Sequence, residues 1–552
     1  MLQENFVSEI AGAIRQYWDR PALSDYQGAR ATYSQIADRI LWLHSIFAGN
    51  HLKRGDKIAV LGRNSKNWGI VYFAAVTYGA VIVPIMPDFY ADDIHHIVNH
   101  SESSLLFADS LLYEQLDDEK MKQLEGIFSL ERFELLCAKK KGLPSIVERA
   151  STHYLDAVKG ALNPENFTVA RVENGELAAI VYTSGTTGFP RGVMLPGNSL
   201  MGNVKFAREN LLLQEGDSVL SFLPIAHCYG CAFDFLFPFI VGCHVTFLGK
   251  IPSPRLLVAA FGEIKPRIIF SVPLVLEKIY KKQIKAKLKK GAVRLLLKVP
   301  GVRKAILGKI RKKLMTVFGG DVLEIVIGGA ALSAEVEQFF KKIKLPLTVG
   351  YGMTECGPLI SYTSSKEHRF ASIGRALEGL MEVRIANPDP ESGVGEILTK
   401  GEHLMCGYYK NEEATDEVLD KDGWLHTGDL GYIDGDGFIY IKGRSKSMYL
   451  GPSGENIYPE PIESKLNNMD YVQESVVVMR DGRLMALVYP DYEHADAHGV
   501  NENRMEKIME KNRLELNKGL PVYSSLSRII LYPEEFEKTP KKSIKRFLYT
   551  AG

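Results

Sequence analysis

The stretch from Thr183 to Gly192 gathers the residue types that bind phosphate. It holds four hydroxyl side chains, three glycines and one cation, Arg191. Glycines let the main chain approach a ligand closely, exposed N–H groups form a nest for anions, and hydroxyl groups add donors to phosphate oxygens. The spacing is not that of a Walker A loop, and a Ser/Thr/Gly cluster alone is usually a plain surface turn. The chemistry of this stretch therefore suits phosphate binding, with a surface turn as the alternative.

Five further segments carry polar or charged groups in short loops. They are residues 221–227, 350–355, 423–429, 443–446 and 539–546. Together with the predicted strand before Thr183 and the Pro-Arg-Gly that ends the stretch, they resemble the motifs of the adenylate-forming superfamily, and they come in the expected order. Members of that superfamily include acyl-CoA synthetases, luciferases and the adenylation domains of peptide synthetases. The resemblance extends from about Arg30 to the C-terminus.

The resemblance implies a reaction in two halves. A carboxylate attacks the α-phosphorus of ATP, which gives an acyl-adenylate and pyrophosphate, and a thiol, usually that of coenzyme A, then takes the acyl group. Since the first half brings two anions together, positioning and charge neutralisation must supply most of the catalysis. ATP and coenzyme A are thus the implied substrates, and Mg²⁺ is the implied cofactor.

Residues 271–280 are similar to the segment that precedes a helical insertion in long-chain synthetases. This similarity implies a medium- to long-chain fatty acid–CoA ligase, an acid–thiol ligase that forms AMP. Two alternatives stay open. One is an acyl-AMP ligase that loads an acyl carrier protein, and the other is a catalytically weakened homologue that binds nucleotide or acyl groups.

The resemblance also assigns a nucleotide site. The residues implied to hold the β- and γ-phosphates are Thr183, Ser184, Gly185, Thr186, Thr187 and Gly188, with Arg191 adding charge. The family more often has Lys at that last position, and Arg presents a rigid fork instead of a point charge. The residues implied around the adenosine and the α-phosphate are Tyr351, Gly352, Thr354, Asp429 and Arg444. Gly329 and Ala330 end a predicted strand, a place where ligands often bind in open α/β sheets.

Catalytic and metal-binding roles follow from the same resemblance. Glu355, with the hydroxyl of Thr186, is the implied ligand of Mg²⁺, which takes one or two carboxylates beside phosphate oxygens. Thr354 is implied to assist at the α-phosphate, and His227 matches a position near the substrate carboxylate that could gate an acyl tunnel. Lys446 lies at the implied hinge, about which a small domain rotates between half-reactions.

The basic tail departs from the family pattern. The adenylation lysine normally stands three residues after the proline, and Ser543 occupies that position. A serine cannot supply the cation that attracts charge in the transition state, so the adjacent Lys542 is the predicted catalytic residue. A second departure is Pro196-Gly197, where family members often have Ser/Thr-His. These two differences motivate the weakened homologue as an alternative.

Cysteines in an apolar stretch allow a competing interpretation. Cys228-x₂-Cys231 followed by Cys243-His244 has the ingredients of a zinc site. The second C-x₂-C is missing, however, and cysteine is common in hydrophobic cores. The stretch therefore predicts either buried core or a metal site.

The hydrophobic pattern predicts the elements that position these residues. Helical spacing at Tyr33–Ala48 and an apolar strand at Lys57–Leu61 begin an alternation typical of parallel sheets covered by helices. At 552 residues the chain exceeds one ordinary core. We predict an α/β fold whose large N-terminal domain, residues 1–443, has two mainly parallel sheet subdomains and a small β-rich subdomain. A small mobile α+β domain, residues 447–552, follows a hinge near 444–447.

Composition limits which partners the protein can bind and which cellular compartment we expect. A net charge of +1 argues against a protein whose whole surface binds nucleic acid. Six cysteines do not form a disulfide framework, and the N-terminus lacks the layout of a signal peptide, so we expect a reducing, cytoplasmic setting. Lys281–Lys313 is dense in Lys and Arg and holds no Asp or Glu. It predicts either a solvated basic face or peripheral contact with an anionic membrane.

Overall fold

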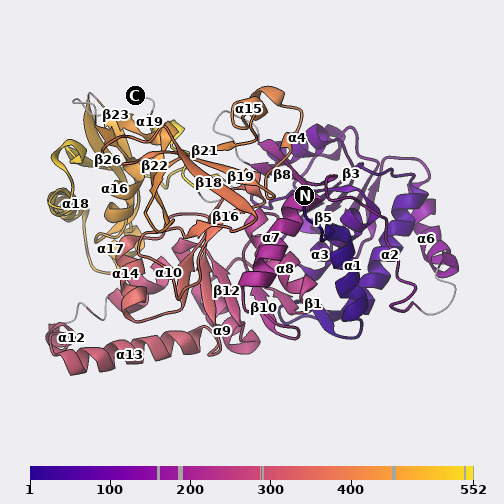
Figure 1. The fold of residues 1–552 in the computed structure, drawn as a ribbon, viewed down its shortest axis with the longest axis horizontal. Helices are drawn as coiled ribbons and strands as arrows, with labels where there is room; N and C mark the ends of the chain where they lie inside the picture. Colours follow the sequence, from indigo (N-terminus) through magenta and orange to yellow (C-terminus); the bar gives the residue numbers. More distant parts are fainter. Residues whose placement is uncertain are drawn as a thin grey trace.

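The computed structural model arranges the chain as layers of sheets and helices, followed by two smaller units (Figure 1). It describes residues 1–157, 162–183, 190–285, 288, 291–450, 455–480, 482–539 and 543–550. Within these ranges, no helix combines the length and the apolar character that crossing a membrane requires.

The first layer is an eight-stranded mixed sheet. Its strands, in spatial order, are β20 (Gly407–Tyr408), β9 (Arg191–Pro196), β8 (Leu177–Thr183), β4 (Val81–Ile85), β3 (Lys57–Leu61), β5 (Ser103–Ala108), β6 (Gly126–Ser129) and β7 (Leu135–Ala138). The strands from β8 to β6 are parallel, whereas β9, β20 and β7 pair antiparallel with their neighbours. The parallel strands are buried apolar runs, as expected where helices cover both faces.

The helices of this layer are α2 (Tyr33–Gly49), α3 (Lys66–Tyr78), α4 (Ala91–Ser101), α5 (Ser110–Tyr113), α6 (Leu143–Ala157) and α7 (Gly197–Asn210). Capping residues in the local sequence mark where two of them begin or end. Thr32 and Gln35 form a capping box at the start of α2. Gly79, at a φ of 88°, ends α3 in the left-handed conformation that glycine adopts without strain. The predicted helix at 33–48 and the predicted strand at 57–61 are confirmed.

The second layer is built from two groups of parallel strands. One is β10 (Ser218–Ser221), β11 (His244–Phe247), β1 (Pro21–Asp25) and the antiparallel β2 (Arg30–Thr32), and the other is β12 (Ile268–Ser271), β13 (Glu324–Ile327) and β14 (Leu347–Val349). The main chains of Arg267 and Ser218 join the groups by one hydrogen bond of 3.4 Å. The helices of this part are α8 (Phe237–Ile240), α9 (Pro254–Ile264), α10 (Pro273–Ile279), α12 (Gly291–Leu296), α13 (Pro300–Val317) and α14 (Ala334–Lys342). The two predicted sheet subdomains are therefore present.

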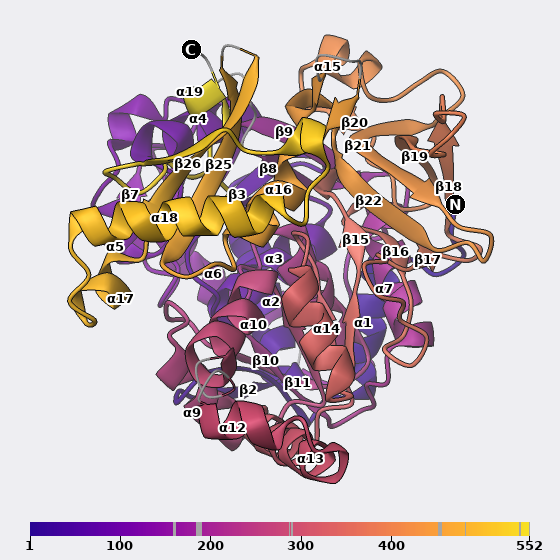
Figure 2. The same ribbon diagram turned by 90° about the vertical axis from the view of Figure 1, so that its left-hand side faces the viewer.

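A small β-rich unit follows, as predicted for the end of the large domain. Its strands are β15 (Tyr351–Gly352), β16 (Leu359–Tyr362) and β17 (Arg375–Ala376), and then β18 (Met381–Ala386), β19 (Gly395–Gly401), β21 (Leu425–Ile433) and β22 (Ile439–Arg444), all antiparallel. The short helix α15 (Glu412–Asp416) lies between β20 and β21 in the chain. Figure 2 shows this unit beside the C-terminal one.

The C-terminal unit has its own sheet and its own apolar core. An antiparallel hairpin joins β25 (Val472–Arg480) to β26 (Arg483–Pro490), and β27 (Arg528–Leu531) pairs parallel with β26. The other elements are β23 (Tyr449–Leu450), β24 (Asn456–Ile457), α16 (Pro459–Leu466), α17 (Tyr492–Asp496), α18 (Glu502–Asn517) and α19 (Phe547–Thr550). Buried apolar residues from Ile457 onward pack in two clusters separate from the main core. The domain limit and hinge at 444–447 stay predictions.

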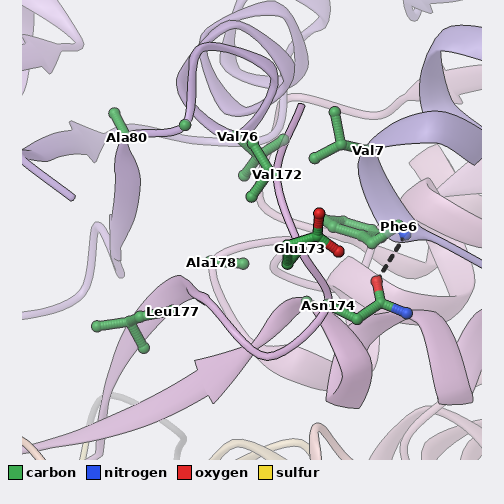
Figure 3. A pocket seen from close by; sticks show the side chains of 11 residues that line it. Phe6, Val7, Val76, Ala80, Val172, Glu173, Asn174, Leu177 and Ala178 are labelled. Atoms are coloured by element: carbon green, nitrogen blue, oxygen red, sulfur yellow. Dashed lines mark hydrogen bonds between the residues drawn. The ribbon is translucent and has the colours of Figure 1, made fainter. Parts of the chain in front are cut away.

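The N-terminal helix α1 (Phe6–Gln16) packs against the segment that enters β8. Phe6 and Val7 line a cavity of about 10 Å³, which has room for about one water molecule, and Leu177 and Ala178 of β8 lie on its other side (Figure 3). The main-chain N–H of Phe6 donates a hydrogen bond of 2.9 Å to Asn174 Oδ1. The start of β8 is thereby fixed to the N-terminus of the chain.

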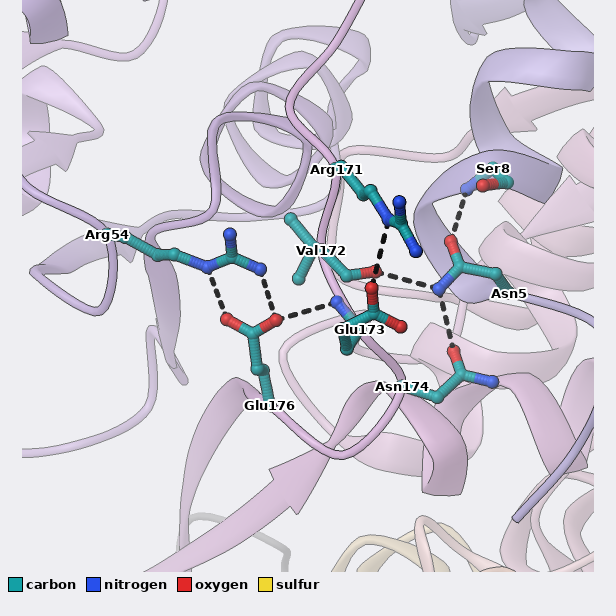
Figure 4. A network of polar contacts seen from close by, with 8 residues as sticks. All are labelled: Asn5, Ser8, Arg54, Arg171, Val172, Glu173, Asn174 and Glu176. Carbon is teal, nitrogen blue, oxygen red and sulfur yellow. Dashed lines mark hydrogen bonds and ion pairs between the residues drawn. The ribbon is translucent and has the colours of Figure 1, made fainter.

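Polar contacts hold the same entry segment on both sides (Figure 4). Asn5 Nδ2 donates to the carbonyl of Val172 at 2.7 Å. On the opposite side, Arg54 forms an ion pair with Glu176, immediately before the strand. Because β8 leads directly to the predicted phosphate loop, these contacts restrain the strand that must position it.

Candidate active site

The β8–β9 hairpin places the two ends of the predicted phosphate loop side by side. Thr183 and Arg191 face each other in the antiparallel register, so the loop leaves and returns at one point. The residues between them that the sequence assigns to phosphate binding, Ser184, Gly185, Thr186, Thr187 and Gly188, lie outside the described residues. Their contacts, including the metal role of Thr186, stay predictions.

A second element of the site is the turn that carries Thr354 and Glu355. This turn, Thr354–Cys356, is a short 3₁₀ helix between β15 and β16. A residue distant in the chain holds the main chain of this turn: Met405 N donates a hydrogen bond of 2.8 Å to the carbonyl of Glu355. Thr354 is buried, whereas Glu355 keeps part of its surface exposed.

Asn203 of α7 holds the far side of this turn. Its Nδ2 donates to the carbonyl of Cys356 at 3.3 Å, and its Oδ1 accepts the N–H of Leu359 at 2.9 Å. His403 donates from Nδ1 to the carbonyl of Leu359 at 2.8 Å. Both side chains are fully buried. Sequence analysis missed them, because no local pattern shows that α7 and residue 403 meet at this turn.

Tyr408 of β20 connects the turn to the phosphate-loop hairpin. Its hydroxyl donates to Glu355 Oε1 at 2.8 Å, and the guanidinium of Arg191 lies 5.7 Å from the centre of its ring. β20 itself pairs with β9 through Tyr408 and Val193. Glu355 and the ends of the predicted loop are thus brought together, as the sequence-based hypothesis requires. Tyr408 was missed because its partner in the sheet is more than two hundred residues away.

The predicted adenosine-binding residues form one hydrogen-bonded group. Tyr351 donates from Oη to Asp429 Oδ2 at 2.6 Å, and Arg444 donates from Nε to Asp429 Oδ1 at 3.0 Å. Burial, and next the charge of Asp429, raise the pKa of Tyr351, so this phenol stays a donor. Asp429 is 6% exposed, and each of its oxygens retains a lone pair for a further donor such as a ribose hydroxyl. The ribose role stays a prediction.

The loop before His227 is braced by Asn64 and Asp234. Asn64 donates to the carbonyl of Leu223 at 2.6 Å and accepts the N–H of Ile225 at 3.0 Å. Asp234 Oδ2 accepts the N–H of Leu223 at 3.3 Å, and burial raises the pKa of this carboxyl well above its usual range. His227 accepts the N–H of Tyr229 at its Nδ1, at 3.2 Å. The structure therefore holds His227 in a fixed loop, and its role at the acyl tunnel stays a prediction.

Tyr229 fills the space between this loop and the end of β13. Its hydroxyl donates to the carbonyl of Val326 at 2.9 Å, and a Cβ at Gly328 would lie 3.0 Å from its ring. Gly329 and Ala330, the next residues, are exposed at the strand end, where the sequence places part of the nucleotide site. Tyr229 thus packs the loop that carries His227 against the end of β13.

The predicted hinge and tail residues lie in the C-terminal part of the chain. Lys446 is exposed in a short turn, Ser445–Ser447, directly after β22. Lys542 lies outside the described residues, so its catalytic role stays a prediction. Ser543 beside it is exposed, and Lys545 lies 5.9 Å from the ring centre of Tyr90 at the start of α4. The tail thus reaches the large unit at α4.

The zinc hypothesis at Cys228, Cys231, Cys243 and His244 is wrong for the described part of the chain. There, no group of three or more His, Cys, Asp or Glu side chains could hold a metal ion. Cys243 Sγ donates to the carbonyl of Gln214 at 3.2 Å, and the ring of His244 is hydrogen-bonded to Ser24. The stretch is core: a π-helical turn, Gly230–Leu236, precedes α8, and β11 follows.

The donor chemistry at Glu355 fits the implied Mg²⁺. The carboxylate offers hard oxygen ligands, and one of them, Oε1, is held by Tyr408. Among the described residues, no hydrogen bond is made to Oε2. A single protein carboxylate with a free oxygen is what Mg²⁺ uses when phosphate oxygens and water complete its shell.

Comparison with known proteins agrees with this geometry. The family model of the AMP-binding enzymes matches residues 10–409. The long-chain-fatty-acid–CoA ligase FadD15 of Mycobacterium bovis is 30% identical over 451 residues, which cover 77% of this chain and 71% of that protein. The long-chain-fatty-acid–CoA ligase ACSBG2 of Rattus norvegicus is 30% identical over 491 residues, 82% of this chain and 71% of that one.

Solved structures share the fold. The anthranilate CoA ligase AuaEII in complex with anthranoyl-AMP superposes with a TM-score of 0.77 at 19% identity, covering 99% of this chain and 97% of that one. The fatty acyl CoA synthetase of Mycobacterium tuberculosis superposes with a TM-score of 0.66 at 20% identity, covering 99% and 98%. The match over residues 10–409 shows that this chain belongs to the family of AMP-binding enzymes.

Proposed function

We propose that this protein is an ATP-dependent, AMP-forming ligase that joins medium- to long-chain fatty acids to coenzyme A. The observation that carries the proposal is the contact between Glu355 and Tyr408, which joins the metal-binding turn to the ends of the phosphate-loop hairpin. The names of the relatives, long-chain-fatty-acid–CoA ligases, support the substrate class.

The chain's own residues can perform the first half-reaction. The hairpin ends and Arg191 would hold the triphosphate, and the Tyr351–Asp429–Arg444 group would orient the ribose and adenine. Glu355 would hold Mg²⁺, which neutralises phosphate charge when bound. Lys542 would supply the cation of the tail, because Ser543 cannot. Each of these roles is a proposal that rests on the family match and on the grouping described above.

The decisive experiment supplies ATP, Mg²⁺ and carboxylic acids of increasing chain length to the purified protein. We expect pyrophosphate exchange into ATP that depends on the fatty acid, and a free thioester once coenzyme A is added. Exchange without a free thioester would favour loading of a carrier protein. Absence of exchange with every acid would reject the proposal and favour a binding protein.

A companion experiment addresses the tail. Lys542→Ala should abolish adenylation in the otherwise unmodified chain, whereas Lys545→Ala removes a cation that is already paired with Glu537. If only Ser543→Lys confers turnover, the weakened homologue becomes the better description.

We also propose that the surface of α12 and α13 contacts anionic membranes peripherally. These helices lie along one edge of the molecule in both views (Figures 1 and 2). Four aliphatic side chains at one end are well exposed: Leu295 (71%), Val299 (51%), Leu296 (46%) and Val302 (36%). The basic side chains of α13 are exposed and, among the described residues, form no ion pair: Arg303, Lys304, Lys309, Arg311, Lys312 and Lys313. Cations around an apolar tip match an anionic lipid surface.

Vesicle sedimentation tests this contact. We expect binding to phosphatidylcholine vesicles that contain phosphatidylglycerol and much weaker binding to phosphatidylcholine alone. Lys312→Glu with Lys313→Glu should weaken binding more than about tenfold, since each surface cation contributes about 1 kcal/mol. The matched control, Lys341→Glu with Lys342→Glu at the exposed end of α14, should bind as the parent does. Equal loss in both pairs would contradict a specific surface.

A further inference from the structure

The hydroxyl of Tyr408 has a single described partner, the Glu355 carboxylate. The distance from Oη to Glu355 Oε1 is 2.8 Å, and Tyr408 is only 7% exposed. The phenol is the donor in this hydrogen bond, because a carboxylate oxygen only accepts. A neutral donor fixed at one carboxylate oxygen restricts the rotation of the whole carboxylate.

The main chain around Tyr408 is fixed as well, so this donor cannot drift from its partner. On one side, Cys406 N donates to the carbonyl of Met194 at 2.8 Å, and Met405 N donates to the carbonyl of Glu355 itself. On the other side, Tyr409 N donates to the carbonyl of Gly192 at 2.7 Å. Residues 405–409 therefore form a strap from the Glu355 turn to the strand that leaves the phosphate loop.

The ring of Tyr408 adds a link to the loop. Arg191 lies 5.7 Å from the ring centre, within the range of a cation–π contact. One side chain thus contacts both the proposed metal carboxylate and the cation proposed to face the phosphates. A residue that served packing alone would not need its hydroxyl at this place, since phenylalanine would fill the same volume.

We infer that Tyr408 is a positioning residue that orients the Glu355 carboxylate, with Oε1 held and Oε2 left to a divalent cation beside the ATP phosphates. The inference rests on the proposed nucleotide and metal roles of this site, and it adds a residue that the sequence motifs do not include. Partners that orient a metal ligand in this way commonly change metal affinity 10- to 100-fold when removed.

The chain offers a matched control next to this residue. Tyr409 is also a tyrosine with a hydrogen bond to a glutamate, since its hydroxyl donates to Glu102 at 3.0 Å. That glutamate lies at the surface, where it also pairs with Lys410. Tyr408→Phe and Tyr409→Phe therefore remove the same atom and the same type of bond, one at the site and one outside it.

The test measures Mn²⁺ binding to the protein–ATP complex by electron paramagnetic resonance, which needs neither fatty acid nor coenzyme A. We expect Tyr408→Phe to weaken Mn²⁺ binding about tenfold or more and to raise the Mg²⁺ concentration for half-maximal pyrophosphate exchange by a similar factor. Tyr409→Phe should match the parent in both measurements. Parent-like Mn²⁺ affinity in Tyr408→Phe would overturn the inference.

A double-mutant cycle separates orientation from simple packing. In a Glu355→Gln background, Tyr408→Phe should cause little further loss of Mn²⁺ binding, because it acts through that carboxylate. An undiminished effect in that background would refute the positioning role. If no acid is ever activated but the Mn²⁺ effects hold, the proposed ligase function fails while the role of Tyr408 stands.

Discussion

The turn around Glu355 and the tail from Lys538 to Arg546 would supply opposite charges to the same reaction, yet they are held differently. The turn rests on Asn203 and His403, which are fully buried, and on main-chain bonds from residues 405–409. In the tail, the described lysines pair with carboxylates of their own unit that remain partly exposed. The Glu355 turn is thus fixed by the core of the large unit. Among the described residues of the tail, Lys545 lies 5.9 Å from the ring centre of Tyr90 in the large unit.

We expect the largest effect on activity from a substitution at Glu355. Glu355→Gln should lower acyl-adenylate formation by more than about hundredfold, because the amide keeps the shape and an acceptor for Tyr408 but lacks the charge for Mg²⁺. Pyrophosphate exchange at saturating Mg²⁺ measures this, with thermal unfolding as the control for an intact fold. A parent-like rate would place the metal elsewhere.

Two ion pairs of the tail differ in burial and should differ in their contribution to stability. Arg546 pairs with Glu463, whose side chain is 11% exposed, whereas Lys545 pairs with Glu537, which is 63% exposed. Arg546→Ala should cost the C-terminal unit about 3–5 kcal/mol, because Glu463 is left buried without its partner. Lys545→Ala should cost about 0.5 kcal/mol or less. Urea unfolding measures both, and equal costs would show that burial does not separate the two pairs.

Acid should destabilise the packing around the Glu355 turn through His403. Burial lowers the pKa of His403 to about 4 from an ordinary value of 6.5, so the folded state prefers the neutral ring. As the pH falls, the unfolded state takes up the proton before the folded state does. The contribution of His403 to stability is therefore complete above pH 6.5 and is lost as the pH falls toward 4. The loss for this residue should reach roughly 3 kcal/mol. Urea unfolding at several pH values should show a shallower slope for His403→Gln, and an unchanged slope would contradict this assignment.

A moderate loss of stability is expected at Asn203. Asn203→Ala leaves the N–H of Leu359 and the carbonyl of Cys356 without this partner inside the protein, which should cost about 1–3 kcal/mol. Unfolding in urea measures the loss. Exposed Asn166→Ala serves as a comparison of the same chemistry, and a similar cost there would argue against a special role for the buried amide.

Much of the fold was predictable because its signals are local. The apolar run Lys57–Leu61 and Gly79 after a helical pattern specify a buried strand and a helix end without reference to the rest of the chain. The hairpin around residue 482 follows from the same kind of signal. The π-helical turn at Gly230–Leu236 was not predicted, because the same apolar sequence is compatible with ordinary helix or strand.

The sequence predicted the functional side chains of the candidate site. It did not predict the residues that hold them in place, such as Tyr408, Asn203 and His403. The motifs identified Glu355, Asp429 and Arg444 by type and order, and the structure brings the last two together. It also shows that a zinc site at Cys228 and Cys231 does not form, which spacing alone left open.

The sequence by itself determined which chemical groups are available, their order along the chain and the family to which that order belongs. Only the tertiary structure decided that Tyr408 meets Glu355 across 53 residues and that Asn203 meets Cys356 across 153. Helix caps and buried strands depend on neighbours in the chain. The orientation of a carboxylate depends on which distant donors the packing of whole layers brings within hydrogen-bond distance, and no local pattern encodes that.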